Sequence, residues 1–395
     1  MQNMLLTFYL TFAAAGPVLG QITSRGIAWW TDILEELLIF LGASDAMRSL
    51  IIDGICAGVG SVLSFIPSIG VLFFCLSMLE ETGYLDMLSR IMGRVLRPLG
   101  IPGQITVPLI MGFGCSVPAI LAADEIKDER SKKMALSLIP FMSCSAKLPL
   151  YGMMTSVFFP DNAGLVTCSL YIIGIFIAMI AAVLWEKFIS PLTVSSSSER
   201  LFGPQFYGFR RPHISKAASC MWENICGFFR KAFTVILVAS VIIWFLENYS
   251  KGLVPAGSPD ESLLADAGRL AAPFFAPLGF GDWRAASALI TGLSAKEAVV
   301  STLTVLAEGG PGSTSAASGL TLPVMLAQIF TPVSAFSFLV FCLLYAPCAA
   351  SMAAMAKASG SIRHAVFTFV FQTAAAWLAA FITYNTGQIL NNFIY

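Results

Sequence analysis

This sequence has little charge and almost no histidine. Only 12% of its 395 residues are Asp, Glu, Lys or Arg and two are His, whereas 57% are hydrophobic. Soluble domains carry about twice that charged fraction, so the composition excludes an ordinary soluble domain and indicates a bilayer protein. The 23 basic and 23 acidic residues balance, and nothing in the charge suggests a nucleic-acid partner.

Catalytic signatures are missing as well. The chain contains no G-x-x-x-x-G-K-[ST] loop for nucleotide phosphates and no H-E-x-x-H or Ser/His/Asp constellation. We therefore predict that it is not an enzyme and that it holds no permanent cofactor. The nine cysteines are odd in number and lie mostly in apolar runs, so we interpret them as free thiols rather than as a disulfide framework.

Long apolar runs recur along the whole chain. Gly164–Trp185 and His364–Tyr384 come close to the roughly 20 residues that cross the hydrocarbon core. Met4–Val18 lacks the basic start of a secretory signal peptide, and we interpret it as a first, rather short, membrane helix. The chain is therefore predicted to cross the membrane several times.

Two stretches of the sequence resemble each other. Pro98-Leu-Gly-Ile and then Pro108 to Cys115 correspond to Pro277-Leu-Gly-Phe and then Ala288 to Ala295. In both halves an amphipathic segment precedes this stretch and a segment interrupted near a cysteine follows it. We divide the chain into a first membrane helix with an extracytoplasmic amphipathic segment (1–53), a first repeat (54–190), a cytoplasmic connector (191–227) and a second repeat (228–395).

The matching segments at 104–122 and 284–304 are predicted to be re-entrant hairpins. If each enters and leaves the membrane on one side, more basic loop residues lie on the side of the connector than if both segments cross. Hairpins also leave each half with an odd number of crossings. The predicted fold is therefore an all-α polytopic membrane protein made of two inverted repeats, each with a re-entrant hairpin and broken helices.

Three cysteines lie where helices are expected to break. Irregular backbone at membrane depth must be buried in protein or line a wet cavity. Thiolate and carboxylate groups in such a cavity suit a borderline transition-metal ion better than Mg²⁺ or Ca²⁺. The alternative is that the cysteines merely pack as small side chains. The break cysteines are Cys115, Cys144 and Cys348, and the small residues beside them include Gly112, Gly114, Ser116 and Ser143.

Charged residues at membrane depth are a second signal. Lys296 and Glu297 fall inside the second predicted hairpin, and Lys147 falls in the interrupted segment of the first half. Charge is costly in a bilayer, so such residues usually face the protein interior and take part in function. The structural alternatives are that Glu297 pairs with one of the lysines, or that Lys147 donates to hairpin carbonyls.

Four motifs follow one another along the chain. With these motifs in this order, the chain resembles the membrane region of the FeoB-type ferrous iron transporters, with its two Gate (nucleoside-recognition-like) repeats. The resemblance covers nearly the whole chain, departs from the family at Ser116, Ala123-Asp124 and Ser145-Ala146-Lys147, and does not include the family's cytoplasmic GTPase domain. The motifs are Gly112-Phe-Gly-Cys-Ser-Val-Pro-Ala-Ile120, Pro140-Phe-Met-Ser-Cys-Ser-Ala-Lys-Leu-Pro149, Ala295-Lys-Glu-Ala-Val-Val300 and Tyr345-Ala-Pro-Cys348.

The resemblance implies a multi-pass ferrous iron transporter of the cytoplasmic (inner) membrane. It implies Cys115, Cys144, Cys348 and Glu297 as metal contacts and Fe²⁺ as transported substrate. From their place at membrane depth we expect Lys147 and Lys296 to support that site. Expected partners are the bilayer, a GTPase on a separate chain, a small cytoplasmic accessory protein and a second copy of the chain. Two alternatives stay open: a Gate-domain transporter of another solute, such as a nucleoside, and a non-transporting membrane scaffold.

The hairpin topology predicts that the loops at 90–97, 127–133, 200–216 and 357–363 share the cytoplasmic side. A membrane-impermeant thiol reagent applied to intact cells should therefore miss a cysteine introduced at Asp128. A cysteine at Lys251, in an outer loop of this topology, should react and serves as the control. Labelling of Asp128→Cys from outside, above the level of the parent chain, would contradict the hairpin topology.

Overall fold

The computed structural model describes residues 16–42, 44–96, 101–189, 214–252, 254–256, 258–308 and 322–394. These residues form helices joined by turns, and their one β bridge links Tyr249 to Pro255. The prediction of an all-α membrane protein is thereby confirmed. Four helical segments within the described ranges are long and apolar enough to cross a bilayer: Glu129–Phe158, Pro160–Lys187, Pro332–Ala358 and Ile362–Asn391.

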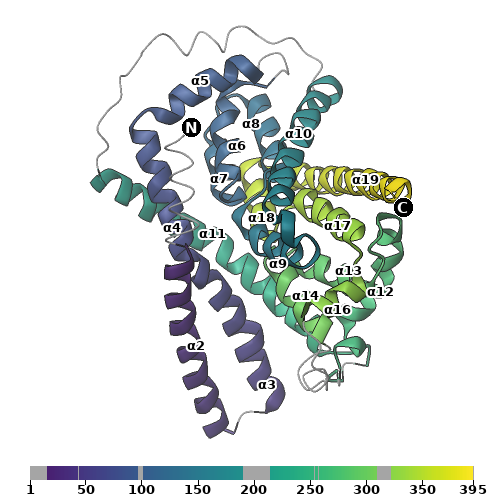
Figure 1. The fold of residues 1–395 in the computed structure, drawn as a ribbon. Coiled ribbons are helices and arrows are strands. Elements are labelled where there is room, and N and C mark those ends of the chain that lie inside the picture. The colour runs from purple at the N-terminus through teal and green to yellow at the C-terminus, as the bar shows by residue number, and fades with distance from the viewer. Residues whose placement is uncertain are drawn as a thin grey trace.

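An arm of long helices projects from the body of the molecule (Figure 1). α2 (Gly16–Phe40) packs against α4 (Ala57–Glu81). α3 (Asp45–Ser49) and the π-helix η2 (Leu50–Cys56) join these two helices. α4 packs along α11 (Ile214–Asn248), which runs from the arm into the body.

Two of the predicted boundaries fall at or near the starts of described helices. The predicted first membrane helix, Met4–Val18, lies mostly outside the described residues, and α2 begins at Gly16. The predicted connector, 191–227, lies mostly outside the described residues, and α11 begins within it at Ile214 and continues for 35 residues. Basic residues made this stretch resemble a loop, but its apolar residues recur at the three- and four-residue spacing of a helix.

The first repeat contains a hairpin followed by a broken helix and a long helix. α6 and α7 are joined by the turn 113–115 and pack against each other, in the order of helix, turn and helix that the predicted hairpin requires. The next helix is interrupted between η5 and η6. The elements are α5 (Tyr84–Leu96), η4 (Gly103–Ile105), α6 (Thr106–Gly112), α7 (Ser116–Asp124), α8 (Glu129–Leu138), η5 (Ile139–Phe141), η6 (Ser145–Lys147), α9 (Leu148–Phe158), η7 (Pro160–Asn162) and α10 (Ala163–Ile189).

The second repeat has the same order of hairpin, broken helix and long helix. α13 and α14 pack against each other across the turn 292–297, and α17 is separated from α18 by the break 345–348. The described part of the first repeat contains no helix that corresponds to α16. The elements after α11 are η9 (Pro259–Glu261), α12 (Leu263–Phe275), η10 (Ala276–Leu278), α13 (Trp283–Thr291), α14 (Ala298–Glu308), α16 (Leu322–Ile329), α17 (Pro332–Leu344), α18 (Ala349–Ala358) and α19 (Ile362–Ile394).

The loop between the first hairpin and α8 is held by its own polar groups. Asp128 caps α8 and accepts a hydrogen bond from the Ser131 amide at 2.9 Å. The Ser131 hydroxyl also donates to this carboxylate and holds the pKa of Asp128 below its ordinary value. Lys132 pairs with Asp124, the last residue of α7, at 2.8 Å. These contacts fix the exit of the hairpin relative to the broken helix that follows.

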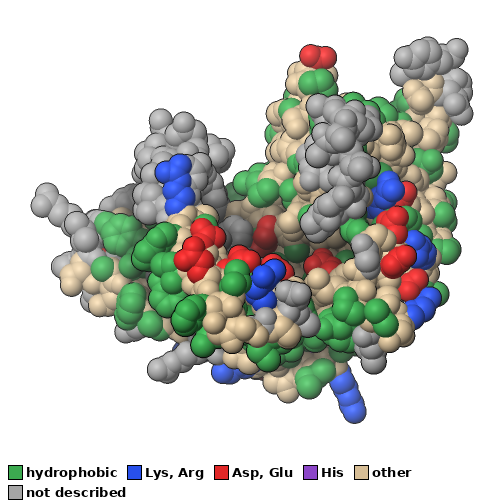
Figure 2. Space-filling model, turned by 90° about the horizontal axis from the view of Figure 1, so that it is seen from below, with side chains coloured by type: hydrophobic (Ala, Val, Ile, Leu, Met, Phe, Trp, Pro, Cys, Tyr) green, Lys and Arg blue, Asp and Glu red, His purple; other side chains and the backbone are tan. Residues whose placement is uncertain are grey.

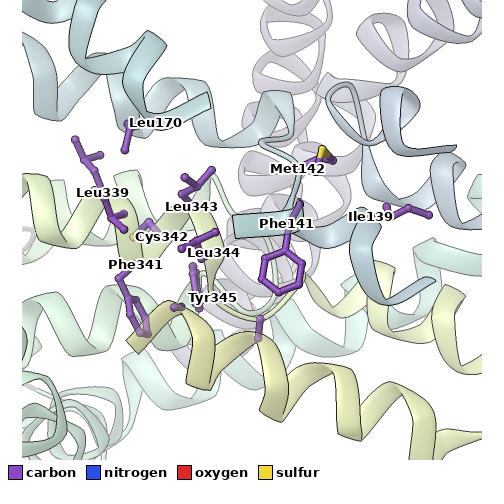
Figure 3. Close-up of a cluster of buried hydrophobic side chains, with 14 of the residues drawn as sticks. Ile139, Phe141, Met142, Leu170, Leu339, Phe341, Cys342, Leu343, Leu344 and Tyr345 are labelled. Carbon is purple, nitrogen blue, oxygen red and sulfur yellow. The ribbon is translucent and has the colours of Figure 1, made fainter. Parts of the chain in front are cut away.

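The hydrophobic core lies where the two broken helices meet. Phe141 at the end of η5 and Leu343 and Tyr345 at the end of α17 belong to one cluster of buried side chains (Figure 3). α19 packs along α17, and its buried alanines allow a close approach. The opposite faces of α10 and α19 expose large apolar side chains, as lipid-facing helices do.

Gly292, at the end of α13, is predicted to tolerate no side chain. A Cβ at Gly292 would lie 2.3 Å from the Tyr345 hydroxyl and 2.3 Å from Val299 Cγ2, both in the core. We expect Gly292→Ala to lower the free energy of unfolding by about 1–3 kcal/mol, measured as thermal unfolding in detergent. Gly152→Ala in α9 is the control, because its Cβ would meet nothing within 4 Å. Equal midpoints for both variants would contradict this packing.

Candidate functional site

Each of the four predicted metal contacts occupies the residue just before a helical segment. Cys115 is the N-cap of α7, Cys144 of η6, and Cys348 of α18. Glu297 immediately precedes Ala298, the first residue of α14. At a helix N-terminus the unpaired amides and the helix dipole favour negative charge. All four predicted contacts therefore lie where unpaired backbone amides begin a helical segment.

These residues converge although the chain separates them widely. Cys115 interacts electrostatically with Cys144, Cys348 and Glu297, and Cys144 interacts with Cys348. All four residues are partly exposed rather than sealed in the core. The two hairpins and the two broken helices thus bring the predicted contacts into one region between the repeats.

The region is not a closed metal site in this arrangement. Within the described ranges, no group of three or more His, Cys, Asp or Glu side chains is placed to hold one ion. The four predicted contacts are neighbours without forming a complete coordination shell. They lie at breaks in the helices, and a shift of one break against another would change their separations. Metal binding by Cys115, Cys144, Cys348 and Glu297 stays a prediction.

Similar hydrogen bonds join the hairpin to the broken helix in both repeats. In the first repeat, the Ser145 amide and Oγ donate to the Gly114 carbonyl at 3.1 and 2.9 Å. In the second, the Ala349 amide donates to the Leu293 carbonyl at 2.8 Å. Ser145 and Ala349 each directly follow the break cysteine of their repeat. The bonds therefore hold the thiol-bearing break against the turn of the hairpin.

The other residues predicted to support the site make local contacts or begin a helix. A Cβ at Gly112 would lie 3.2 Å from two side-chain atoms of Met142, so glycine lets the hairpin approach the first break. The Ser143 hydroxyl lies 3.0 Å from the buried Tyr151 hydroxyl, close enough for a hydrogen bond. Ser116 is the first residue of α7 and is partly exposed.

Both intramembrane lysines bind backbone carbonyls around the break between α17 and α18. Lys147 Nζ donates to the Leu343 carbonyl at 2.6 Å, and Lys296 Nζ donates to the Ala346 carbonyl at 2.6 Å. Lys296 Nζ also lies 3.1 Å from the centroid of the Tyr345 ring. The two lysines are 4% and 5% exposed, so these contacts replace water around their ammonium groups.

The ion pairs considered as alternatives for these lysines are not formed. Neither ammonium group pairs with a carboxylate in the part of the chain that the structure describes. Lys147 donates across the repeats to α17 rather than to a hairpin carbonyl. The physical reason is that the break leaves carbonyls of the last turn of α17 without helical partners, whereas a buried carboxylate would itself have to be desolvated.

Tyr345 is a residue whose role the sequence analysis missed. It begins the Tyr345-Ala-Pro-Cys348 motif, but only the cysteine was given a function. The ring lies beneath Lys296, and the buried hydroxyl has no hydrogen-bond partner in the described residues. The sequence feature that could have indicated this contact is an aromatic residue at a proline-containing break, in a chain with lysines in its apolar segments.

One face of the molecule carries acidic side chains around a hollow (Figure 2). Some acidic side chains at the surface pair with neighbouring basic side chains. Asp266 lies 3.3 Å from Lys251 and 3.5 Å from Arg269, and Glu35 lies 3.8 Å from Arg48. Such exposed pairs contribute little to stability. The carboxylates of Asp266 and Glu35 are therefore part of a solvated, ion-paired surface.

A scan against family models matches the Gate family, described as nucleoside recognition, at residues 62–158 and 229–362. The two matched ranges fall in the two repeats.

Relatives match almost the whole chain. The Fe(2+) transporter FeoB of Staphylococcus aureus (strain MSSA476) is 35% identical over 98% of this chain and 56% of that protein. FeoB of Methanocaldococcus jannaschii is 33% identical over 98% of this chain and 56% of that protein. A Fe(2+) transport protein A/Fe(2+) transporter FeoB fusion protein of Porphyromonas gingivalis is 32% identical over 97% of this chain and 49% of that protein. The chain thus spans about half the length of these relatives. No solved structure matches it.

The Ser145 hydroxyl is predicted to strengthen the contact between hairpin and break. Ser145→Ala removes the 2.9 Å bond to Gly114 but keeps the bond from the amide, which is the arrangement already present at Ala349. We expect the free energy of unfolding to fall by about 1 kcal/mol, measured by thermal unfolding in detergent. Ser156→Ala is the control, because its exposed hydroxyl bonds only within its own helix. A larger loss at Ser156 than at Ser145 would refute the role.

Proposed function

Because the chain belongs to the Gate (nucleoside recognition) family, in the form found in the membrane part of the Fe(2+) transporters FeoB, we propose that it moves Fe²⁺ across the cytoplasmic membrane. The ion is the transported substrate and passes between the two repeats. The observation that carries the proposal is the convergence of Cys115, Cys144, Cys348 and Glu297 at helix N-termini. The four long apolar helices support a multi-pass membrane location.

The donor atoms favour a metal ion over a nucleoside. A nucleoside site needs several side-chain amides or carboxylates to hold base and sugar hydroxyls. The described breaks and hairpin turns offer instead three thiols and one carboxylate, the donors that suit a borderline divalent ion such as Fe²⁺. Nucleoside transport is thereby the weaker candidate, although the family description names nucleoside recognition.

Transport in this proposal follows from the breaks in the helices. Each predicted contact lies on backbone outside a helix, with a rigid helix directly after it. The hydrogen bonds from Ser145 and Ala349 tie each break to the hairpin of its own repeat, so a repeat shifts as one unit. A relative shift of the repeats brings the contacts around the ion and then opens them to the other side.

The proposal also includes partners. The FeoB relatives are longer than this chain, and we assign the energy-supplying GTPase to a part of the transporter outside the sequence described here. The fusion of Fe(2+) transport protein A to FeoB in one relative supports an accessory protein on the cytoplasmic side. No bond is made or broken at the proposed site itself.

The proposal predicts that soft donors are required for uptake. Cys115→Ser, Cys144→Ser and Cys348→Ser exchange a thiolate for a hydroxyl of similar size, and Glu297→Gln removes a charge. We expect each to lower initial Fe²⁺ uptake into proteoliposomes by about tenfold or more per folded molecule, because loss of ligand quality costs about that much affinity. Unfolding temperatures should change little, since these side chains are partly exposed.

Cys168→Ser is the matched control, because Cys168 is exposed on α10 away from the breaks. It should transport Fe²⁺ at the rate of the parent. If all four site variants also match the parent, the thiol pathway is wrong. If the parent takes up a radiolabelled nucleoside but no Fe²⁺, the ion itself is wrong.

A further inference from the structure

The side-chain amide of Gln372 is buried without a hydrogen-bond partner. Gln372 lies in α19, and its side chain is 0% exposed. Five buried side-chain nitrogen or oxygen atoms in the described ranges have no partner, and three of them belong to Gln372 and Tyr345. A buried amide that binds nothing is destabilising, because it has lost its hydrogen bonds to water. Such a group in a folded protein requires an explanation.

Gln372 faces α17 together with small side chains of α19. Gln372, Ala376 and Ala380 follow one another at intervals of four residues, so they share one face of α19, and all three are fully buried. The Ser337 hydroxyl of α17 donates to the Ala380 carbonyl at 3.0 Å, which identifies α17 as the helix against that face. The Gln372 amide is therefore enclosed at the interface of α19 and α17.

The contacts of the preceding residue place Gln372 along the length of α17. The Phe371 ring packs edge to face on Phe141, with centroids 6.1 Å apart. A Cβ at Gly174 would lie 3.2 Å from the Phe141 carbonyl oxygen and 3.4 Å from a side-chain atom of Leu343, so Phe141 and Leu343 are neighbours. Leu343 belongs to the last turn of α17. The amide thus lies near the end of α17, where the chain enters its break.

A side-chain amide is suited to support a break that moves. It donates through its nitrogen and accepts through its oxygen, so it can bind either kind of backbone group that the end of a helix leaves free. In the present arrangement the lysines bind the Leu343 and Ala346 carbonyls, and the Gln372 amide binds neither. A shift of the break stretches the lysine bonds and frees backbone groups that lipid cannot bind. The neighbouring amide can then replace the lost partners.

We propose that Gln372 is a positioning residue for the break that carries Cys348, and that its amide binds backbone groups of this break in a second arrangement, in which the break has shifted. The inference rests on the proposed function for the purpose of this motion, not for its existence. The unpartnered amide destabilises the present arrangement and so narrows its free-energy difference from the second one. Tyr345, whose hydroxyl is likewise buried and unpartnered, begins the same break.

The test replaces the amide by an apolar side chain of similar length. Gln372→Met removes an unpartnered group from the present arrangement and a bond from the second one. We expect its unfolding midpoint in detergent to be at least as high as that of the parent. The maximal rate of Fe²⁺ uptake into proteoliposomes should fall by about tenfold per folded molecule, the order expected for one lost buried hydrogen bond. The KM should change little, because Gln372 does not contact the ion.

Two variants of the same helix pair are controls. Ser337→Ala removes a buried hydroxyl that is already bonded across this interface, so it should lower the midpoint and leave uptake per folded molecule unchanged. Thr373→Val removes a hydroxyl that donates within α19, to the Phe369 carbonyl at 2.8 Å, and should also leave uptake unchanged. If Gln372→Met lowers the midpoint as far as Ser337→Ala does, or fails to fold, the amide is already partnered and the inference is overturned.

Alkylation of Cys348 reports on the break without any transport. In the present arrangement the Cys348 thiol is partly exposed and lies 3.2 Å from the Ser351 hydroxyl. Because the second arrangement opens the break, its loss in Gln372→Met should slow the reaction of Cys348 with N-ethylmaleimide, followed on the Cys348 peptide by mass spectrometry.

The two proposals therefore fail in different ways. If the parent takes up no Fe²⁺ but Gln372→Met slows the alkylation of Cys348, the proposed function is wrong and the positioning role stands. If the parent takes up Fe²⁺ and Gln372→Met matches it in uptake and in alkylation, transport stands and the positioning role is overturned.

Discussion

The arrangement of the two repeats depends on how backbone groups freed at membrane depth are satisfied. Every break in a helix leaves carbonyls and amides that lipid cannot bind. Here protein groups supply the partners: the lysines donate to the Leu343 and Ala346 carbonyls, and the amides of Ser145 and Ala349 donate to the hairpin turns. The breaks that carry the thiols are possible only because these donors are present.

The two repeats are not fully equivalent, and one of the differences connects them. Ser145 and Ala349 make equivalent bonds within their own repeats. The lysines differ, because Lys296 binds Ala346 of its own repeat, whereas Lys147 reaches from the first repeat to Leu343 of the second at 2.6 Å and lies 3.5 Å from the Met142 carbonyl of its own repeat. That break is therefore held from both sides of the molecule. A shift of either repeat alters the support of the residues just before Cys348.

The sequence predicted more of the fold than of the site. Apolar runs, proline and glycine at the breaks, and the internal repeat predicted the hairpins and broken helices, because these depend on local patterns of residues. The bonds of Lys147 and the role of Tyr345 were not predicted, since they depend on which carbonyls two distant segments bring together. The start of α11 at Ile214 was missed because basic residues at its beginning resemble those of a loop.

The polar groups of this region favour some kinds of ligand for a cation over others. Carbonyl oxygens at helix breaks are common ligands for cations in membrane proteins. In this protein, two carbonyls at the break beside Cys348 already bind ammonium groups, and helix N-termini rather than C-termini face the converging residues. Dipoles and fixed charges thus disfavour a cation held by oxygen dipoles alone. What remains are ligands that carry their own negative charge, and among these thiolate sulfur binds Fe²⁺ more strongly than it binds Mg²⁺ or Ca²⁺. The three break cysteines therefore offer a cation ligands that do not depend on the carbonyls bound by the lysines.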